Sequence, residues 1–144
     1  MNTVELLKIL KLWFPQQYVR VCSIKNLKTD KPGLYILNTA SEGPGLHWVA
    51  MYVTETTVEF FYSYGRSPQY LRNGSMFMEA IGSKTLLVHS KCLQQTTSKV
   101  CGVYCLAFLY VRATNKLTSF FQLFDRNRQC NDDKVVDYVN SLCI

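Results

Sequence analysis

Apolar residues recur at helical spacing near the N-terminus, where 2–14 is predicted to form an amphipathic helix that Asn2 can cap. Residues 101–113 are apolar on every side, which is typical of a helix buried inside a domain. Weaker patterns predict two more helices, one over residues 70–81 and one that Asn131 caps near the C-terminus.

Between these helices, short β-prone runs bounded by turn residues predict strands. The predicted strands cover residues 34–37, 46–53, 58–64 and 85–89, with a hairpin turn at 54–57. This order of elements predicts an α+β fold, and 144 residues are the usual size of one domain, so we expect a single domain over 1–144.

Composition narrows the class of protein. Hydrophobic residues make up 48% and charged residues 18%, as in packed globular domains. The net charge of +6 allows association with a polyanion such as nucleic acid, although an ordinary basic surface explains it equally well. Since neither a signal peptide nor a membrane-spanning stretch is visible, we expect a protein that is not secreted and has no membrane partner.

The six cysteines indicate neither a disulfide framework nor a zinc site, because they form no CxxC pair and no histidine lies near a cysteine pair. We therefore expect no metal. Cys101 differs from the others because a loop leads into it and it opens the buried helix, with Ser98 as the expected cap. A helix N-terminus and a nearby imidazole both stabilise a thiolate, so Cys101 is the candidate nucleophile. Packing roles are expected for Cys105, Cys130 and Cys143.

Two histidines are available as a base. His89 lies inside a predicted strand and is expected to be structural. His47 begins a strand after a Gly- and Pro-containing loop, so it can face another element. Gln94 precedes Cys101 by seven residues, and its amide can donate to an oxyanion together with the Cys101 N–H, although a plain surface glutamine is the ordinary alternative.

Three stretches resemble the adenovirus-type cysteine endopeptidases (adenain), in the clan that includes the SUMO-specific proteases. They are ILNTASEGPGLHWVAMYV (36–53), FFYSYGRSP (60–68) and QQTTSKVCGVYCLAFL (94–109). They occur in the family's order of base, acid, glutamine and nucleophile, and nothing after about residue 115 matches. The resemblance implies a central mixed β-sheet flanked by helices, with the nucleophile at the N-terminus of a buried helix.

The resemblance also implies roles: His47 as base, Cys101 as nucleophile and Gln94 as oxyanion donor. The implied substrate slot for small residues is bordered by Trp48, Gly45 and Gly102. The implied reaction is endoproteolytic cleavage of viral precursor proteins at glycine-containing sites through an acyl-enzyme. The implied location is a virion or the host nucleus or cytoplasm.

One position departs from the family. Tyr62 stands where the family has its acid, and a phenol carries no charge at neutral pH. Three alternatives stay open. The enzyme can work as a Cys–His dyad oriented by Tyr62 or a backbone carbonyl, or its activity can be weakened. Glu59 or Asn38 can also replace the acid, although strand alternation turns Glu59 away from Tyr62. Because a thiol depends less on a third member than a hydroxyl does, we expect a working enzyme.

Family members can be activated by DNA and by a peptide joined through a cysteine. The matching position here holds Ser83, which does not support a tethered peptide. No cofactor is expected to be required, and DNA or an activating peptide stays open as a partner. Two other functions fit the same fold: a deconjugating isopeptidase for SUMO- or ubiquitin-like proteins, and a non-catalytic module that binds DNA or a capsid protein, for which Tyr62 is the best sign.

Overall fold

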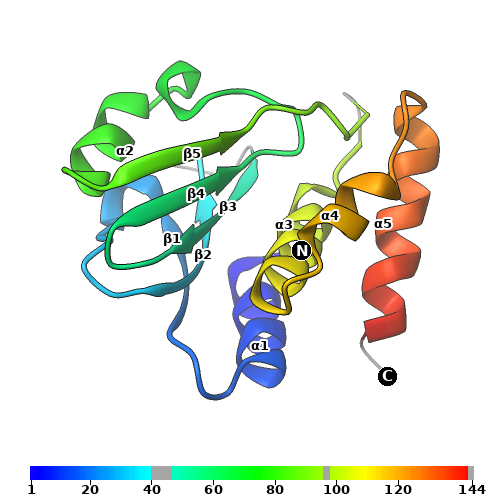
Figure 1. Cartoon of the computed structure of the whole chain (residues 1–144), viewed down its shortest axis with the longest axis horizontal. Coiled ribbons are helices and arrows are strands. Elements are labelled where there is room, and N and C mark those ends of the chain that lie inside the picture. Colours follow the sequence, from blue (N-terminus) through cyan, green and yellow to red (C-terminus); the bar gives the residue numbers. More distant parts are fainter. Residues whose placement is uncertain (40–46, 96–97, 143–144) are drawn as a thin grey trace.

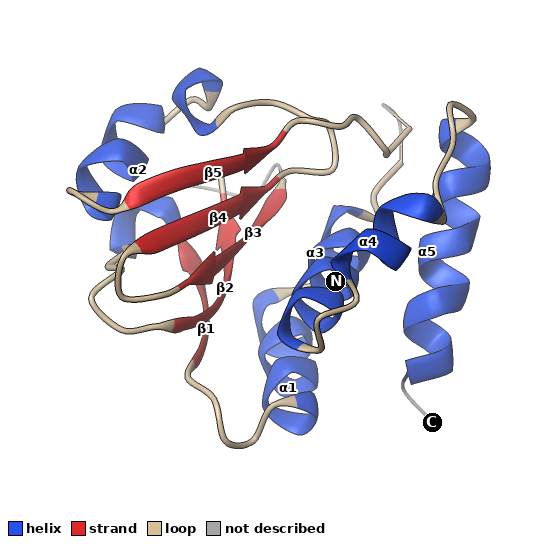
Figure 2. Ribbon diagram, in the orientation of Figure 1, coloured by secondary structure: helices blue, strands red, loops and turns tan. Residues whose placement is uncertain are grey.

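The computed structural model describes residues 1–39, 47–95 and 98–142, and at its centre lies a mixed five-stranded sheet (Figures 1 and 2). The strands lie side by side in chain order, the two outer pairs parallel and the two inner pairs antiparallel. They are β1 (Val19–Ser23), β2 (Gly33–Asn38), β3 (Trp48–Val53), β4 (Thr57–Phe61) and β5 (Thr85–His89).

Helices cover both faces of this sheet, as Figure 1 shows. On one face of the sheet lies α2 (Gly74–Ile81), in contact with the short 3₁₀ helices Ile24–Asn26 and Pro68–Tyr70. The opposite face carries α1 (Thr3–Trp13), α3 (Cys101–Ala113), α4 (Leu117–Gln122) and α5 (Arg128–Leu142). The predicted fold class, an α+β domain with a mixed sheet between helices, is therefore confirmed.

The ends of α1 follow from its sequence. The Asn2 side chain accepts a hydrogen bond from the Glu5 N–H (2.9 Å) while the Glu5 carboxylate accepts one from the Asn2 N–H (3.0 Å), which is a complete capping box. Leu6 and Leu10 are spaced one turn apart and are both fully buried. This anchors the N-terminal segment beside α3.

The buried helix α3 fills the space between the sheet and α5. Its apolar residues pack on all sides, and the ring of Phe108 stacks on Phe61 of β4 with centroids 4.7 Å apart. Burial on every side explains why the sequence 101–113 has no polar face. A helix held this firmly fixes the position of its first residue, Cys101.

Several predicted boundaries were wrong. The strand predicted over 58–64 ends at Phe61, because the chain turns there and the Gly65 N–H donates to the Tyr62 carbonyl (2.8 Å). The last helix begins at Arg128, so Asn131 lies inside it and is not its cap. Cys130, predicted to pack inside, is exposed. The strand β1 and the helix α4 were not predicted.

In the part of the chain that the structure describes, no helix combines the length and the apolar character needed to cross a membrane.

Candidate active site

Cys101 is the first residue of α3 and is 7% exposed. Its sulfur accepts a hydrogen bond from the backbone N–H of Trp48 (3.4 Å). The first-turn N–H groups of a 13-residue helix add a positive electrostatic potential at the same atom. Val100, and not Ser98, is the cap residue of the helix, and no side chain caps it.

His47 lies immediately before β3, and its carbonyl accepts a hydrogen bond from the Thr39 N–H (3.0 Å). Its half-buried ring contacts two tyrosine rings, Tyr62 at 5.8 Å and Tyr64 at 5.3 Å between centroids, the latter nearly perpendicular. Burial lowers the pKa of His47, and the positive charge of Arg66 lowers it further. The imidazole is therefore mainly neutral at pH 7, the state that accepts a proton.

The Cys101 thiol reaches the backbone one residue from His47. Cys101 contacts the backbone of Trp48, the residue that follows His47. Burial raises the pKa of both Tyr62 and Tyr64, and the negative charge of Cys101 acts in the same direction on both phenols. The two rings that contact His47 are therefore within electrostatic range of the Cys101 sulfur.

Tyr62 is 3% exposed and lies next to His47, in the place expected for an acid. Its phenol keeps its proton at neutral pH because burial raises its pKa. Glu59 is turned to the other face of the sheet, as strand alternation predicted, and Asn38 pairs with Trp48 in the β2–β3 register. Among the described residues, the charge that acts on His47 comes from Arg66 and not from a carboxylate.

The turn after Tyr62 requires a glycine. Gly65 has a φ of 74°, and a Cβ there would lie 2.5 Å from the Ser90 carbonyl oxygen. This close passage brings the segment after β5 against the end of β4, where the N–H groups of Leu93 and Gln94 donate to the Ser63 carbonyl (2.8 and 3.1 Å).

Gln94, predicted to donate to an oxyanion, is fully buried. Its Oε1 accepts a hydrogen bond from the Ser63 hydroxyl (2.5 Å), and its Nε2 donates to the carbonyl (3.1 Å) and hydroxyl (2.9 Å) oxygens of Ser98. In this arrangement the amide holds the loop before Cys101. Donation to an oxyanion requires the amide to exchange these partners and stays a prediction.

The predicted slot residues lie near the N-terminal segment. The Trp48 indole N–H donates to the Met1 carbonyl (3.2 Å). A Cβ on Gly102 would meet Trp48 at 3.4 Å, Leu6 at 3.5 Å and Met1 at 3.6 Å. One wall beside the nucleophile is therefore built by the indole and the start of α1. Gly45, the third residue predicted to border the slot, lies outside the described residues.

Sequence reasoning missed the residues that hold the loop. The Tyr64 hydroxyl lies 3.4 Å from the carbonyl oxygens of both Gln95 and Ser98, and Ser63 bonds Gln94 through its hydroxyl. The sequence offered one sign of Ser63 and Tyr64: they directly follow Tyr62, the residue aligned with the family's acid.

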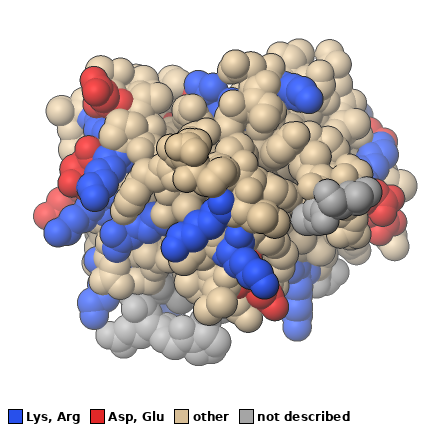
Figure 3. Space-filling model, turned by 90° about the horizontal axis from the view of Figure 1, so that it is seen from below, with Lys and Arg blue, Asp and Glu red and all other residues tan. Residues whose placement is uncertain are grey.

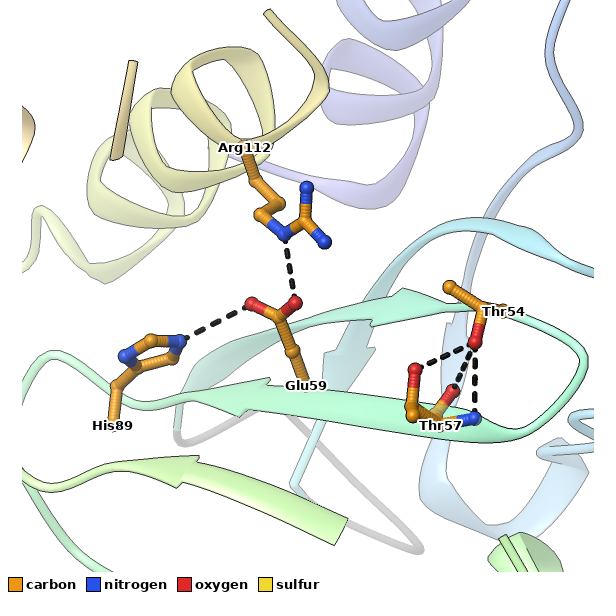
Figure 4. A network of polar contacts seen from close by, with 5 residues as sticks. All are labelled: Thr54, Thr57, Glu59, His89 and Arg112. Atoms are coloured by element: carbon orange, nitrogen blue, oxygen red, sulfur yellow. Dashed lines mark hydrogen bonds and ion pairs between the residues drawn. The ribbon is translucent and has the colours of Figure 1, made fainter. Parts of the chain in front are cut away.

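His89 occupies a different region, as predicted for a structural residue. Figure 4 shows the Glu59 carboxylate between Arg112 and His89, with one oxygen 2.7 Å from Arg112 Nε and the other 3.4 Å from His89 Nε2. The His89 ring also lies against Phe108 (5.2 Å) and Phe121 (5.4 Å). This network joins β4 and β5 to the C-terminal end of α3.

Basic side chains are spread across the face of the molecule seen from below, and the acidic ones lie mostly at its margins (Figure 3). Over the described ranges, no group of three or more His, Cys, Asp or Glu residues could hold a metal ion. The cysteines in those ranges, including Cys101, are free thiols.

No family model and no curated protein matches the chain. Several solved structures are similar in fold, including the two that follow. One is described as the ASFV pS273R protease (14% identity, TM-score 0.56, 93% of this chain and 65% of that one). The other is AvrA delL154 with IP6 and CoA (16% identity, TM-score 0.57, 89% of this chain and 54% of that one). This chain thus spans 65% and 54% of their lengths. At these identities the likeness shows that the fold is shared, and it does not single out adenain.

Proposed function

We propose that this chain is a cysteine endopeptidase that cleaves precursor proteins at glycine-containing sites. The observation behind the proposal is the Cys101 sulfur at the start of α3, which accepts the Trp48 N–H beside His47. The similarity in fold to the ASFV protease supports the reaction class and extends the proposal to viral or virus-like precursors in a virion or in the host nucleus or cytoplasm.

The proposed reaction begins with the neutral imidazole of His47, which takes the thiol proton as the Cys101 sulfur attacks the scissile carbonyl. The Cys101 N–H donates to the oxyanion that forms, with Gln94 as the proposed second donor. The imidazolium then gives its proton to the leaving amine, and the C–N bond breaks to leave a thioester. Water, deprotonated by His47, hydrolyses the thioester, which frees the acid product and the thiol.

The absence of a carboxylate beside His47, over the described residues, does not prevent this cycle. A thiol is acidic enough that the base needs less help than it does with serine. The rings of Tyr62 and Tyr64 restrict the imidazole by packing, in place of a charged hydrogen-bond acceptor. The proposed enzyme is therefore a Cys–His dyad with aromatic orientation.

The test uses a thiol-reactive peptide probe that ends in glycine, applied to the full chain at neutral pH. We expect labelling at Cys101, none in Cys101→Ser, and much slower labelling in His47→Ala. Cys130→Ser is the matched control, because Cys130 is an exposed thiol far along the chain. Labelling of Cys101 at the same rate in wild type and His47→Ala would contradict the proposal and favour a non-catalytic module.

The same experiment separates peptidase from isopeptidase activity. A second probe carries a whole ubiquitin-like protein in place of the short peptide. Equal rates for the two probes support the endopeptidase, since the short sequence then contains what the site recognises. A strong preference for the protein-sized probe would instead indicate deconjugation.

The proposed slot is tested with Gly102→Ala. The added methyl would meet its nearest neighbour at 3.4 Å, an ordinary contact, so we expect the protein to fold normally. Because the methyl takes up space beside the indole of Trp48 in the proposed slot, we expect kcat/KM for a glycine substrate to fall by roughly tenfold. An unchanged kcat/KM would mean that Gly102 and Trp48 do not border the substrate slot.

Association with DNA is a further part of the proposal, supported by the net charge of +6 and by the basic face in Figure 3. We expect binding that weakens steeply as salt rises and that does not depend on sequence. Fluorescence anisotropy with labelled duplexes at several salt concentrations measures it, and an affinity independent of salt would contradict it.

A further inference from the structure

The C-terminal helix α5 reaches the loop that precedes the nucleophile. We call residues 93–95 and 98–100 the nucleophile loop. Asn131 of α5 is fully buried, and its Nδ2 donates to the Leu93 carbonyl (3.2 Å) and to the Asp125 carbonyl (2.8 Å). Its Oδ1 accepts from the Asp125 N–H (3.0 Å). One amide therefore joins the nucleophile loop, the segment after α4 and the first turns of α5.

Asp132, the next residue, makes a second connection. It is 8% exposed, and its Oδ1 accepts hydrogen bonds from the Tyr104 hydroxyl (2.8 Å) and the Gln95 N–H (3.4 Å). Tyr104 lies on α3 three residues after Cys101, whereas Gln95 lies six residues before it. A single carboxylate oxygen thus connects the two segments that flank the nucleophile in the chain.

The Tyr104 phenol is suited to be a permanent donor. It is fully buried and packs against Phe124, with ring centroids 5.8 Å apart. Burial and the neighbouring Asp132 raise the pKa of Tyr104, so the hydroxyl keeps its proton at any pH at which the protein is studied. Buried charged hydrogen bonds of this kind hold geometry tightly, because breaking one leaves a desolvated carboxylate.

We propose that Asp132 is a positioning residue of the candidate site: its carboxylate, together with the Tyr104 hydroxyl, fixes the nucleophile loop against the first turn of α3 and so places Cys101. This inference rests on the proposed peptidase function. Asp132 does not touch the reacting atoms and acts through Gln95 and Tyr104. It comes from the region after residue 115 that shares no motif with the resembled family.

The experiment compares four variants of the full chain with wild type. Asp132→Ala removes the acceptor, Asp132→Asn keeps an acceptor oxygen, Tyr104→Phe removes only the hydroxyl, and Asp133→Ala changes the exposed neighbour as the matched control. Each is measured by kcat and KM on a glycine-containing peptide and by amide hydrogen exchange. A positioning role moves both readouts, and a purely structural role moves stability alone.

For Asp132→Ala we expect kcat to fall on the order of 10- to 100-fold with KM unchanged, since a displacement of about 1 Å at a nucleophile has an effect of this size. Exchange should accelerate in residues 93–95 and in the first turn of α3, and not elsewhere. Asp132→Asn should recover most of kcat. Tyr104→Phe should repeat the loss, and its combination with Asp132→Ala should be no worse than either alone.

Two results would overturn the proposal. One is an Asp132→Ala protein whose kcat and loop exchange equal those of Asp133→Ala. The other is exchange that accelerates evenly over the whole chain, which indicates a global stabilising role. If Asp132→Ala does not fold, Tyr104→Phe decides by the same readouts, because it keeps the buried ring. If wild type cleaves no peptide, the proposed function fails, whereas the exchange comparison still tests the placement of the loop.

Discussion

The chain has two histidines, and they lie in opposite chemical surroundings. His89 has a carboxylate partner, Glu59, and its ring packs against the rings of Phe108 and Phe121. His47 precedes Trp48, whose N–H donates to the Cys101 sulfur, and its ring contacts two tyrosine rings, with Arg66 as the charge that acts on it. The histidine with the more familiar catalytic partner is therefore not the one that we propose as the base.

Under the proposed function, a carboxylate–imidazole contact is by itself a poor sign of catalysis, because the proposed base is the histidine that lacks such a contact among the described residues. Glu59 also accepts a hydrogen bond from Arg112 at 2.7 Å, and the guanidinium lies 4.4 Å from the centre of the Tyr52 ring. Such a network joins the sheet to the end of α3. At His47 the ring is held by packing, and a lowered pKa keeps it available as a base.

Replacing each histidine in turn has the largest expected effect. We expect His47→Ala to lower kcat/KM by about 10²- to 10⁴-fold, the usual contribution of a general base, with little change in stability. His89→Ala should leave kcat/KM nearly intact and lower the free energy of unfolding by about 1–3 kcal/mol, because a packed ring and a charged hydrogen bond are lost. Peptide hydrolysis and urea unfolding on both variants measure this. The reverse pattern would exchange the two assignments.

Glu59→Gln tests the structural half of the comparison. Glu59 is 7% exposed, and its removal leaves Arg112 and His89 without the carboxylate that they share. We expect the free energy of unfolding to fall by about 2 kcal/mol, the usual size for a charged hydrogen bond of this burial. Glu55→Gln on the exposed turn is the control and should change stability by less than about 0.5 kcal/mol. Equal urea midpoints for the two variants would mean that the network contributes nothing.

Tyr62→Asp asks what a carboxylate would do beside His47, with Tyr62→Asn as the control of similar size and no charge. A negative charge at this position raises the pKa of His47, because it stabilises the imidazolium. The acid limb of kcat/KM should therefore move to higher pH by about one unit in Tyr62→Asp relative to Tyr62→Asn. Identical pH profiles for the two variants would show that position 62 does not reach the imidazole.

Much of this architecture was predictable because local signals and tertiary contacts agree. The capping box at Asn2 and the all-apolar segment 101–113 each predicted an element whose ends the structure reproduces closely. The strand β1 was missed because Arg20 interrupts its short apolar pattern, and pairing with β2 forms it instead. The helix α4 has six residues with one fully buried, too few for a period to appear.

The candidate site was predictable in its members and not in its supports. Cys101, His47 and Tyr62 could be placed from motifs in order along the chain. The turn at Gly65 and the contacts of Asp132 join residues that lie far apart in the sequence, such as Asp132 and Tyr104 with a separation of 28, and no local pattern carries that information. Gln94 shows the same limit, since its burial between Ser63 and Ser98 depends on a loop and a strand end meeting.

The smallest expected effect is a change in stability at acid pH when His47 is replaced, and it follows from the lowered pKa of this residue. The unfolded chain binds a proton at this residue near its ordinary pKa of 6.5, whereas the folded protein binds it only at lower pH. The stability that His47 contributes is thus fully present above the unfolded value and is lost as pH falls through the folded one. Melting temperatures measured from about pH 7 to about pH 5 should decline less steeply in His47→Gln than in wild type, whereas His89→Gln should keep the His47-dependent part of the slope. A wild-type slope that His47→Gln leaves unchanged would mean that the imidazole is solvated like that of the unfolded chain, and the neutral-base mechanism would then lose its electrostatic support.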